Sequence, residues 1–461
     1  MNAIILSAVW GVIMMFGGVF FTKKTAPKYF AIFGIVLILI ANCFEFKGFV
    51  FNVDYHGMFV FDNFGLLFNA IAFCCTLLYF LLNGNEIEKV GKNVSEYFAL
   101  IFFVLCGVAI ASSFKTLLML FLGIEIMSIP LYILTGSDKK DLKGNEASLK
   151  YFLMGAFSTG ILLMGIAFIY GGNSLGSFSI DNIQLGSGKL PTLIAVGLVL
   201  VLVAMSFKVS AAPFHFWTPD VYDGAPTVFT SFMATIVKIA GFIAFIRLFQ
   251  YSFGNMQSQW QILIVIITAS TLLIGNITAV FQQSVKRMLA YSSIAQAGFM
   301  MLAIFALNDK AKEGIILYSA AYSLASIGLF AILVKMNDYT IEGFNGLSKK
   351  EPLLAFCATI FLLSLTGIPL TAGFLAKFFI LLAAVQQGHQ FWIVILAVLC
   401  AAISAYYYFR VIQAMYFKQP QTEPLTGIVT SGFKNVLLFV VFLIILLGIL
   451  PGMLIGWLYV S

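Results

Sequence analysis

Long apolar segments, almost free of charge, recur along the whole 461-residue chain. Their lengths suit crossings of a hydrocarbon core about 30 Å thick. Runs such as VLLFVVFLIILLGILPGMLIGWLYV are apolar on every face, whereas the strands of a membrane barrel alternate in polarity. We therefore predict an all-α polytopic membrane protein with about 14 transmembrane helices. The segments run over residues 3–21, 29–44, 62–82, 97–113, 115–134, 149–170, 190–216, 225–249, 260–282, 287–307, 314–334, 353–386, 390–417 and 434–458.

Composition excludes a soluble enzyme. Hydrophobic residues make up 61% of the chain and charged residues 10%, against about 45–50% and about 25% in soluble proteins. The net charge of +7 comes from scattered residues and does not indicate nucleic-acid binding. The six cysteines lie in or beside apolar segments without CxxC spacing, which favours packing roles. The first segment lacks the features of a signal peptide and reads as a retained span.

The basic residues predict the orientation of the chain. One alternating set of connections holds 17 lysines and arginines, and the other set, in which Arg247 is counted, holds 6. Because basic residues collect on the cytoplasmic side, the first set should be cytoplasmic. Both termini should then lie outside the cytoplasm.

Four ionisable residues lie inside apolar segments: Glu125, Lys208, Lys238 and Lys377. A charge at the centre of a membrane helix costs about 2.5–3.5 kcal/mol on insertion scales. Such groups should face a hydrated interior, pair with one another or be partly neutral. A structural ion pair of Glu125 with one lysine is the simpler alternative, but one acid cannot satisfy three lysines. We therefore interpret the set as a path that takes up and releases protons.

Two of these lysines lie beside predicted helix breaks. Lys208 precedes Pro213 in the seventh segment, and Lys377 follows Pro369 in the twelfth. Proline removes a backbone donor, and broken membrane helices are typical of transporters built from inverted repeats. Since the two breaks lie five segments apart, we predict two inverted five-helix repeats, each with one broken helix. The predicted division is three N-terminal helices in 1–96, repeats in 97–249 and 260–417, and a last helix in 418–461.

Each of the other polar residues near the breaks has two possible roles. His215, seven residues beyond Lys208, is a candidate proton shuttle or a hydrogen-bonded packing residue. The tenth segment carries Ser292, Ser293 and Gln296, which can join helices or line a proton wire. The chain has no phosphate-binding loop, nucleotide fingerprint or metal-ligand cluster. It should move a charged species and perform no covalent chemistry.

Three stretches carry a family resemblance: KVSAAPFHFWTPDVYDGAPT (208–227), VKRMLAYSSIAQAG (285–298) and LTGIPLTAGFLAKF (365–378). They resemble the signature stretches of the proton-conducting antiporter-like subunits of respiratory complex I (NADH:quinone oxidoreductase), over essentially the whole chain. The resemblance implies that Glu125 pairs with Lys208, that Lys238 links inward, and that Lys377 connects to an exit.

Within that family, the chain is similar to the N-type subunit, the relative of NADH dehydrogenase subunit 2. It ends soon after its last span, unlike the L-type, and has Lys377 where the M-type typically has glutamate. Fourteen spans favour a bacterial form, and the resemblance then implies a location in the bacterial inner membrane. Gln296 stands where many relatives have histidine, which puts a histidine relay in doubt, and Val228 stands where relatives often have proline.

The resemblance implies a membrane-arm subunit that translocates protons across the bilayer. NADH oxidation and quinone reduction would drive it from partner subunits, which would hold the flavin (FMN) and the iron–sulfur clusters, with none on this chain. Its partners would be the other membrane-arm subunits and the lipid bilayer. The alternatives are a subunit of a sodium/proton antiporter of the same fold, and a scaffold whose buried charges only hold neighbours together.

Overall fold

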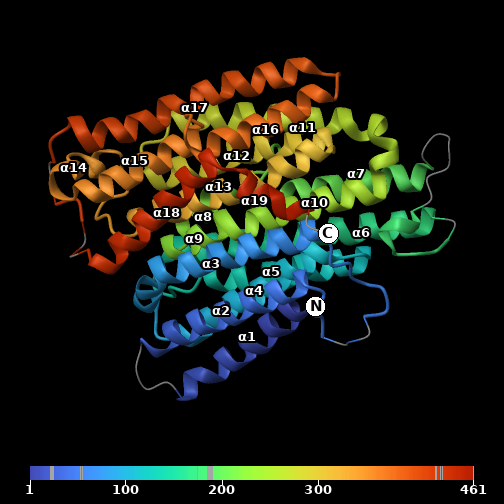
Figure 1. Cartoon of the computed structure of the whole chain (residues 1–461), viewed down its shortest axis with the longest axis horizontal. Coiled ribbons are helices and arrows are strands. Elements are labelled where there is room, and N and C mark those ends of the chain that lie inside the picture. The colour runs from blue at the N-terminus through green and yellow to red at the C-terminus, as the bar shows by residue number, and fades with distance from the viewer. Residues whose placement is uncertain are drawn as a thin grey trace.

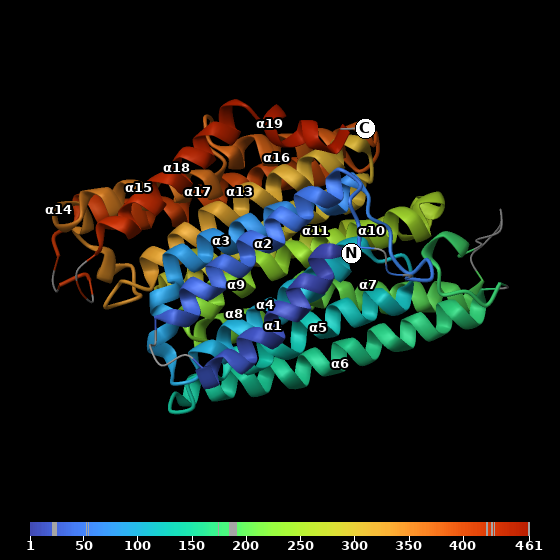
Figure 2. The ribbon, with the colours of Figure 1, turned by 60° about the horizontal axis from the view of Figure 1, so that its bottom comes forward.

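The helices of the chain lie side by side in one bundle. The structure is a computed structural model and describes residues 1–20, 25–51, 53, 55–173, 175–183, 191–420, 423–425, 427 and 429–459. Within these residues every regular element is a helix, and extended pairing is limited to isolated β-bridges. Figures 1 and 2 show most helix axes running in the same general direction, as crossing one membrane requires. The all-α prediction is confirmed.

Twelve helices among the described residues are long and apolar enough to cross a membrane. Each of them coincides with one predicted segment. They are α1 (Asn2–Phe20), α2 (Ala26–Phe46), α3 (Asn63–Val90), α4 (Val94–Ser113), α5 (Leu117–Thr135), α6 (Leu142–Gly172), the continuous unit of α9 (Thr227–Phe232), the π-helical turn η2 (Met233–Val237) and α10 (Lys238–Phe253), then α11 (Gln257–Val280), α12 (Val285–Ala306), α13 (Asp309–Leu333), α17 (Phe391–Phe417) and α18 (Ser431–Ile449).

The two remaining predicted segments are broken helices, as the prolines indicated. The seventh span consists of α7 (Thr192–Lys208) and α8 (Trp217–Gly224), of which α8 lies beyond the predicted segment 190–216, and the twelfth consists of α15 (Pro352–Thr366) and α16 (Ala372–Gln386). Short helices fill several connections: η1 (Ile180–Asn182), η3 (Gly254–Met256), η4 (Glu342–Phe344), α14 (Leu347–Lys350), α19 (Gly452–Ile455) and η5 (Gly456–Tyr459).

Helix α8 occupies residues that the sequence suggested were a connection. Pro219 lies in its first turn, where a missing N–H costs no helical hydrogen bond. Trp217 is buried, stacks on Tyr151 of α6 with ring centroids 4.8 Å apart, and donates from Nε1 to the carbonyl oxygen of Phe207 at 3.1 Å. This packing, which short-range sequence pattern does not reveal, makes α8 the second half of the seventh span.

The break in the twelfth span depends on two glycines. Gly367, directly after α15, has φ +89°, a backbone conformation that residues with a side chain rarely adopt. Gly373, in the first turn of α16, lies so close to α15 that an added Cβ would overlap the carbonyl oxygen of Ser364. The two half-helices therefore touch backbone to backbone at the break.

The two predicted repeats share one packing pattern. In the first, α4 packs on α5, α5 on α6, α6 on α7, and α10 returns to α4. In the second, α11 packs on α12, α12 on α13, α13 on α15 and α16, and α17 returns to α11. The order of partners is the same in both sets of five spans. The division into two inverted repeats and its boundaries stay a prediction.

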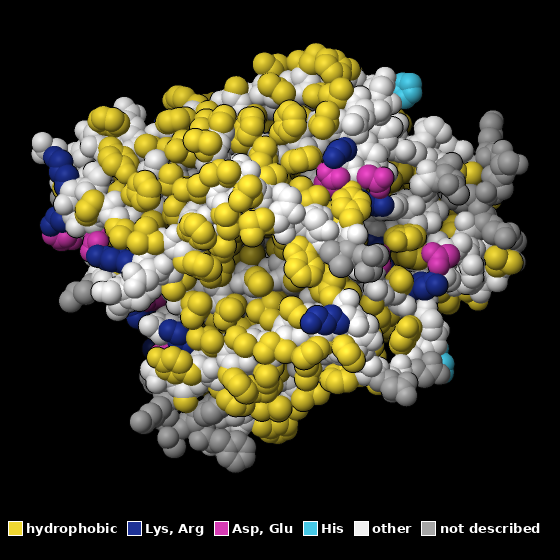
Figure 3. Space-filling view, viewed as in Figure 1, with side chains coloured by type: hydrophobic (Ala, Val, Ile, Leu, Met, Phe, Trp, Pro, Cys, Tyr) yellow, Lys and Arg dark blue, Asp and Glu magenta, His cyan; other side chains and the backbone are white. Residues whose placement is uncertain are grey.

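Both chain ends lie at the same end of the bundle (Figure 1). The N-terminal amino group of Met1 pairs with Glu45 at the end of α2, and the Trp457 ring lies 5.9 Å from the ring of Phe46. Figure 3 shows hydrophobic side chains across the middle of one face and most charged ones towards the two ends. That distribution suits a bundle that spans a bilayer.

Candidate functional site

The four ionisable residues of the apolar segments lie in four different spans. Lys238 and Lys377 are buried, with 2% and 6% of their surface exposed, and Glu125 and Lys208 are half-buried. They come from α5, α7, α10 and α16. Membrane depth and burial together make these groups the candidate site.

Lys208 is the last residue of α7, where the chain leaves the helix. A cation is favoured at this position because the unpaired carbonyls of a helix C-terminus carry partial negative charge. Its Nζ donates to Ser128 Oγ of α5 at 3.0 Å. The two side chains line a cavity of about 20 Å³, the size of a single water, together with Tyr151 and Trp217.

Glu125 does not form the direct ion pair that the resemblance implied. Ser128, one turn further along α5, contacts Lys208 instead, although Glu125 is near enough to act on the lysine electrostatically. Glu125 lies on the outward face of α5, in line with Leu122 and Ile129, which are 41% and 52% exposed. The carboxylate is therefore turned partly away from the lysine and towards whatever covers this face.

Lys238 follows the π-helical turn of its span and points to α12. Its Nζ donates to the carbonyl oxygen and the Oγ of Ser293, at 2.7 Å and 3.0 Å. Val237 and Gly241, which flank Lys238 on the same span, line the cavity beside Lys208. Lys238 thus lies between the first broken span and the helices of the second repeat.

Lys377 reaches back over the break in its own span. Its Nζ donates to the carbonyl oxygens of Leu365 and Thr366, at 2.8 Å and 2.9 Å, and lies 4.5 Å from the centroid of the Phe299 ring. These carbonyls are free because α15 ends at Thr366. The break therefore supplies the acceptors that hold a cation inside the bundle.

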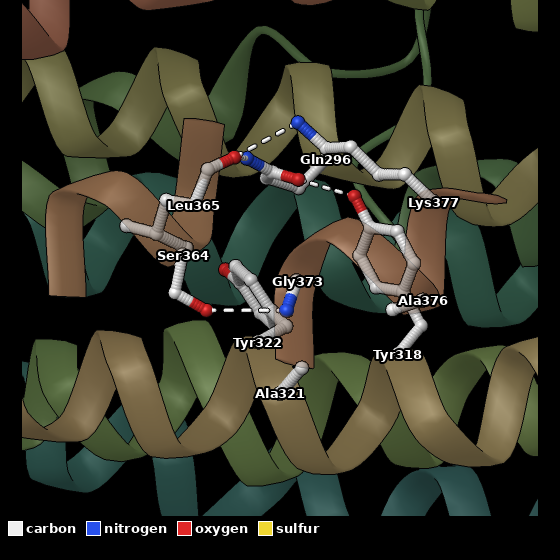
Figure 4. A pocket seen from close by; sticks show the side chains of 9 residues that line it. All are labelled: Gln296, Tyr318, Ala321, Tyr322, Ser364, Leu365, Gly373, Ala376 and Lys377. Carbon is white, nitrogen blue, oxygen red and sulfur yellow. Dashed lines mark hydrogen bonds between the residues drawn. The ribbon is translucent and has the colours of Figure 1, made fainter. Parts of the chain in front are cut away.

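Gln296 joins Lys377 to a hydrogen-bonded network (Figure 4). Its Nε2 donates to the carbonyl oxygen of Leu365 at 2.9 Å and to the hydroxyl of Tyr408 at 3.2 Å, and its Oε1 accepts from the Tyr318 hydroxyl. Figure 4 shows Lys377, Gln296 and Tyr318 around a cavity of about 10 Å³, close to the smallest that holds a water. A histidine relay through this span was in doubt because Gln296 stands where many relatives have histidine. In the structure, the Gln296 amide and the hydroxyls of Tyr318 and Tyr408 form the connection.

His215 lies apart from these contacts. It is 6% exposed in the turn between α7 and α8, its ring centroid is 4.7 Å from that of Phe216, and it interacts with the backbone at Pro213. None of the hydrogen bonds described for the chain joins it to a lysine of the site. Both readings of His215 stay predictions.

The burial of one further charged residue was not predicted from the sequence. Arg247 was counted with the residues of a connection, but it lies in α10 with 1% of its surface exposed. It pairs with Asp62 at 3.0 Å and donates to the carbonyl oxygens of Phe114 and Ser112. The only sequence signal was its position at the edge of an apolar segment. Its contacts join α10 to the start of α3 and the end of α4.

The three lysines of the site have only neutral hydrogen-bond acceptors among the described residues. Lys208, Lys238 and Lys377 are held by hydroxyl and carbonyl oxygens, and none forms an ion pair within 4 Å among the described residues. An ammonium group with only neutral acceptors in low dielectric is less strongly held in its charged form than an ion-paired one. Among the described residues, no group of three His, Cys, Asp or Glu is placed to hold a metal ion.

The chain is similar to known membrane subunits. The family described as "NADH:quinone oxidoreductase/Mrp antiporter, TM" matches residues 115–404. NADH-quinone oxidoreductase subunit N of Cytophaga hutchinsonii is 40% identical, covering 98% of this chain and 98% of the relative. A chain of respiratory complex I from Thermus thermophilus is 31% identical, with a TM-score of 0.85 and 98% of each chain covered.

A chain of the Mrp complex from a Dietzia species also has a TM-score of 0.85, with 99% of this chain and 96% of the other covered, but only 19% identity. That likeness shows a shared fold. The family of this chain is shown by the match to the family model and by the 40% identity to the Cytophaga hutchinsonii subunit over nearly the full length of both chains. The chain therefore belongs to the NADH:quinone oxidoreductase/Mrp antiporter family of membrane subunits, among the relatives named NADH-quinone oxidoreductase subunit N.

Proposed function

We propose that this chain is the N-type membrane-arm subunit of an NADH:quinone oxidoreductase and translocates protons across the membrane. NADH oxidation and quinone reduction on partner subunits, which carry the flavin and the iron–sulfur clusters, supply the energy. The observation that carries the proposal is Lys377, a buried cation held by two carbonyl oxygens at a helix break. The location is a bacterial inner membrane, with both termini outside the cytoplasm.

Glu125 is the point at which a neighbouring subunit acts in this proposal. Its position on the exposed face of α5 places a carboxylate against the next subunit of the membrane arm, because a charge facing lipid at this depth would be costly. A change in that neighbour moves the carboxylate or alters its charge. The field of Glu125 on Lys208 changes with it.

The proton then moves inward along the lysines. When Glu125 supports the ammonium group, Lys208 holds its proton, with Ser128 as the direct acceptor. When that support weakens, Lys208 releases a proton by way of Lys238 and the Ser293 contact towards Lys377. A change of one pKa unit corresponds to about 1.4 kcal/mol, so a small part of the redox energy suffices for each transfer.

The test is proton translocation by the assembled complex with Lys208→Ala or Glu125→Ala. We expect fewer protons moved per electron, measured in inside-out vesicles while NADH oxidation is followed in parallel. Normal stoichiometry in complexes that assemble fully would contradict the proposed path and favour the scaffold alternative. Lys312→Ala, which removes a lysine at the surface, is the matched control.

The antiporter alternative is tested by identifying the subunits that co-purify with this chain. Flavin and iron–sulfur subunits that co-migrate with it in a mild-detergent native gel, with NADH-dependent activity, support the proposed function. Sodium/proton exchange in a complex without those subunits would overturn it.

A further inference from the structure

The break in the seventh span is bound by a residue of α11. The backbone amide of Ala212 donates to the hydroxyl oxygen of Thr271 at 2.8 Å, and both residues are fully buried. Among the hydrogen bonds described for residues 209–216, this is the only one that reaches a different span. Helix α11 packs mainly on α12 and α17, whereas α7 packs mainly on α6. The contact therefore joins the break to a helix outside the main neighbours of α7.

The residues between Lys208 and Ala212 adopt a conformation that needs external support. The amide of Ser210 donates to the carbonyl oxygen of Phe207 at 3.1 Å, and the next amide donates to that of Ser206 at 2.8 Å. Ser210 has φ +63°, a left-handed conformation that residues other than glycine rarely adopt. Such a conformation persists where the surrounding structure fixes it. Ala212, two residues further on, is fixed by Thr271.

The hydroxyl of Thr271 is oriented to accept from the break. Its own proton is donated to the carbonyl oxygen of Ile267 in α11, at 2.5 Å, so the oxygen is left as an acceptor for the amide of Ala212. Thr268, three residues earlier, is also fully buried and donates to the carbonyl oxygen of Ile264 at 2.6 Å. No described hydrogen bond joins Thr268 to another helix. The two threonines therefore differ in the contact with the seventh span.

The position of the break determines where Lys208 lies. Lys208 is the last residue of α7, four residues before Ala212, and its Nζ donates to Ser128 Oγ of α5 at 3.0 Å. On α10, an added Cβ at Gly241 would lie 3.1 Å from Cγ1 of Val209, so this helix also packs closely on the end of α7. The contact between Lys208 and Ser128 thus depends on a backbone segment whose far end is bound to α11.

We propose that Thr271 is a positioning residue for proton translocation: by binding the amide of Ala212, it keeps the end of α7 where Lys208 reaches Ser128. The inference rests on the proposed function, because Lys208 is the group that is positioned. Thr271 acts through the backbone and carries no proton itself. Without its oxygen, a buried amide loses its acceptor, which is costly. The segment 209–212 then rearranges, and the end of α7 moves Lys208 away from Ser128.

The first experiment measures the contact without measuring pumping. Thr271→Val keeps the shape of the side chain and removes the acceptor, and Thr268→Val is the matched control on the same helix. Amide hydrogen exchange of the assembled complex is followed by mass spectrometry of peptides that contain Ala212. We expect about tenfold faster exchange at Ala212 in Thr271→Val, a change of about 1.4 kcal/mol, and no change in Thr268→Val. Unchanged exchange in both variants would overturn the inference.

The second experiment tests whether the contact acts on Lys208. We expect about tenfold slower proton translocation in Thr271→Val, and a rate close to wild type in Thr271→Ser, which keeps the hydroxyl. Combining Thr271→Val with Ser128→Ala should cost little more than the worse single change, because both act on one contact.

A purely structural role for Thr271 predicts other results. Equal loss in Thr271→Val and Thr271→Ser, or losses that add in the double variant, would overturn the positioning role and leave the proposed function standing. Normal translocation by Lys208→Ala would refute the proposed function, while hydrogen exchange would still decide whether Thr271 fixes the break.

Discussion

The ammonium group of Lys377 lies 2.8 Å from the carbonyl oxygen of Leu365, and the amide of Gln296 binds the same oxygen from the other side at 2.9 Å. A single backbone oxygen thus joins the buried lysine of the twelfth span to the polar residues of α12, α13 and α17. The lysine is held without a carboxylate, so the protein can keep it in place whether or not it carries a proton.

Lys377→Arg should assemble but translocate protons poorly. Arginine keeps the positive charge and can donate to the same carbonyls, but it does not release its proton in proteins. The measurement is protons translocated per NADH oxidised, with the complex quantified on a native gel. Wild-type stoichiometry with Lys377→Arg would mean that Lys377 contributes charge and does not carry a proton.

Ser128→Ala should slow translocation without stopping it. The hydroxyl is the direct acceptor for Lys208, and loss of a hydrogen bond to a charged group costs about 1.5–3 kcal/mol. Glu125 still supports the ammonium group electrostatically. Translocation rates of Ser128→Ala and Ser128→Thr should therefore differ, because only threonine keeps a hydroxyl. Equal loss in both variants would point to packing and away from the hydrogen bond.

Gly373→Ala should disrupt the twelfth span. An added methyl group would overlap the carbonyl oxygen of Ser364, so α15 and α16 would have to separate. We expect loss of assembled complex, measured by native gel and by thermal inactivation. Gly160→Ala in α6 is the control, because nothing lies within 4 Å of its added Cβ. It should be neutral or slightly stabilising, since alanine is favoured over glycine in a helix by about 1 kcal/mol.

Asp62→Ala should destabilise the protein through Arg247. The side chain of Arg247 is 0% exposed and that of Asp62 is 28% exposed. Removing the carboxylate leaves the buried guanidinium with carbonyl acceptors alone, at a cost of up to about 3–5 kcal/mol. Lys312→Ala breaks a surface pair with Asp309 at 3.4 Å and should change stability by less than about 1 kcal/mol. The melting temperature of the purified complex measures both. Similar values for the two variants would rule out a stabilising role for the Asp62–Arg247 pair.

The membrane spans and their breaks could be predicted because hydropathy and proline act locally. The depth of Lys238 and Lys377 follows from the same pattern. The hydrogen-bond acceptors of Lys377 could not be predicted, because every residue has a carbonyl oxygen. Only the packing of α15 against α16 brings the carbonyl oxygens of Leu365 and Thr366 to the lysine. Arg247 was misplaced because a residue at the edge of an apolar segment can turn either way, and its carbonyl partners come from α4, far away in sequence.

The two broken spans carry their lysines differently. Lys208 ends the first half of its span, and its acceptor Ser128 belongs to α5. Lys377 lies on the second half of its span, while both of its acceptors belong to the first half. A sliding motion between α15 and α16 would therefore pull Lys377 off its carbonyls, whereas the same motion in the seventh span would leave Lys208 on Ser128. Lys377 therefore ties the two halves of the twelfth span to each other, whereas Lys208 ties the seventh span to α5.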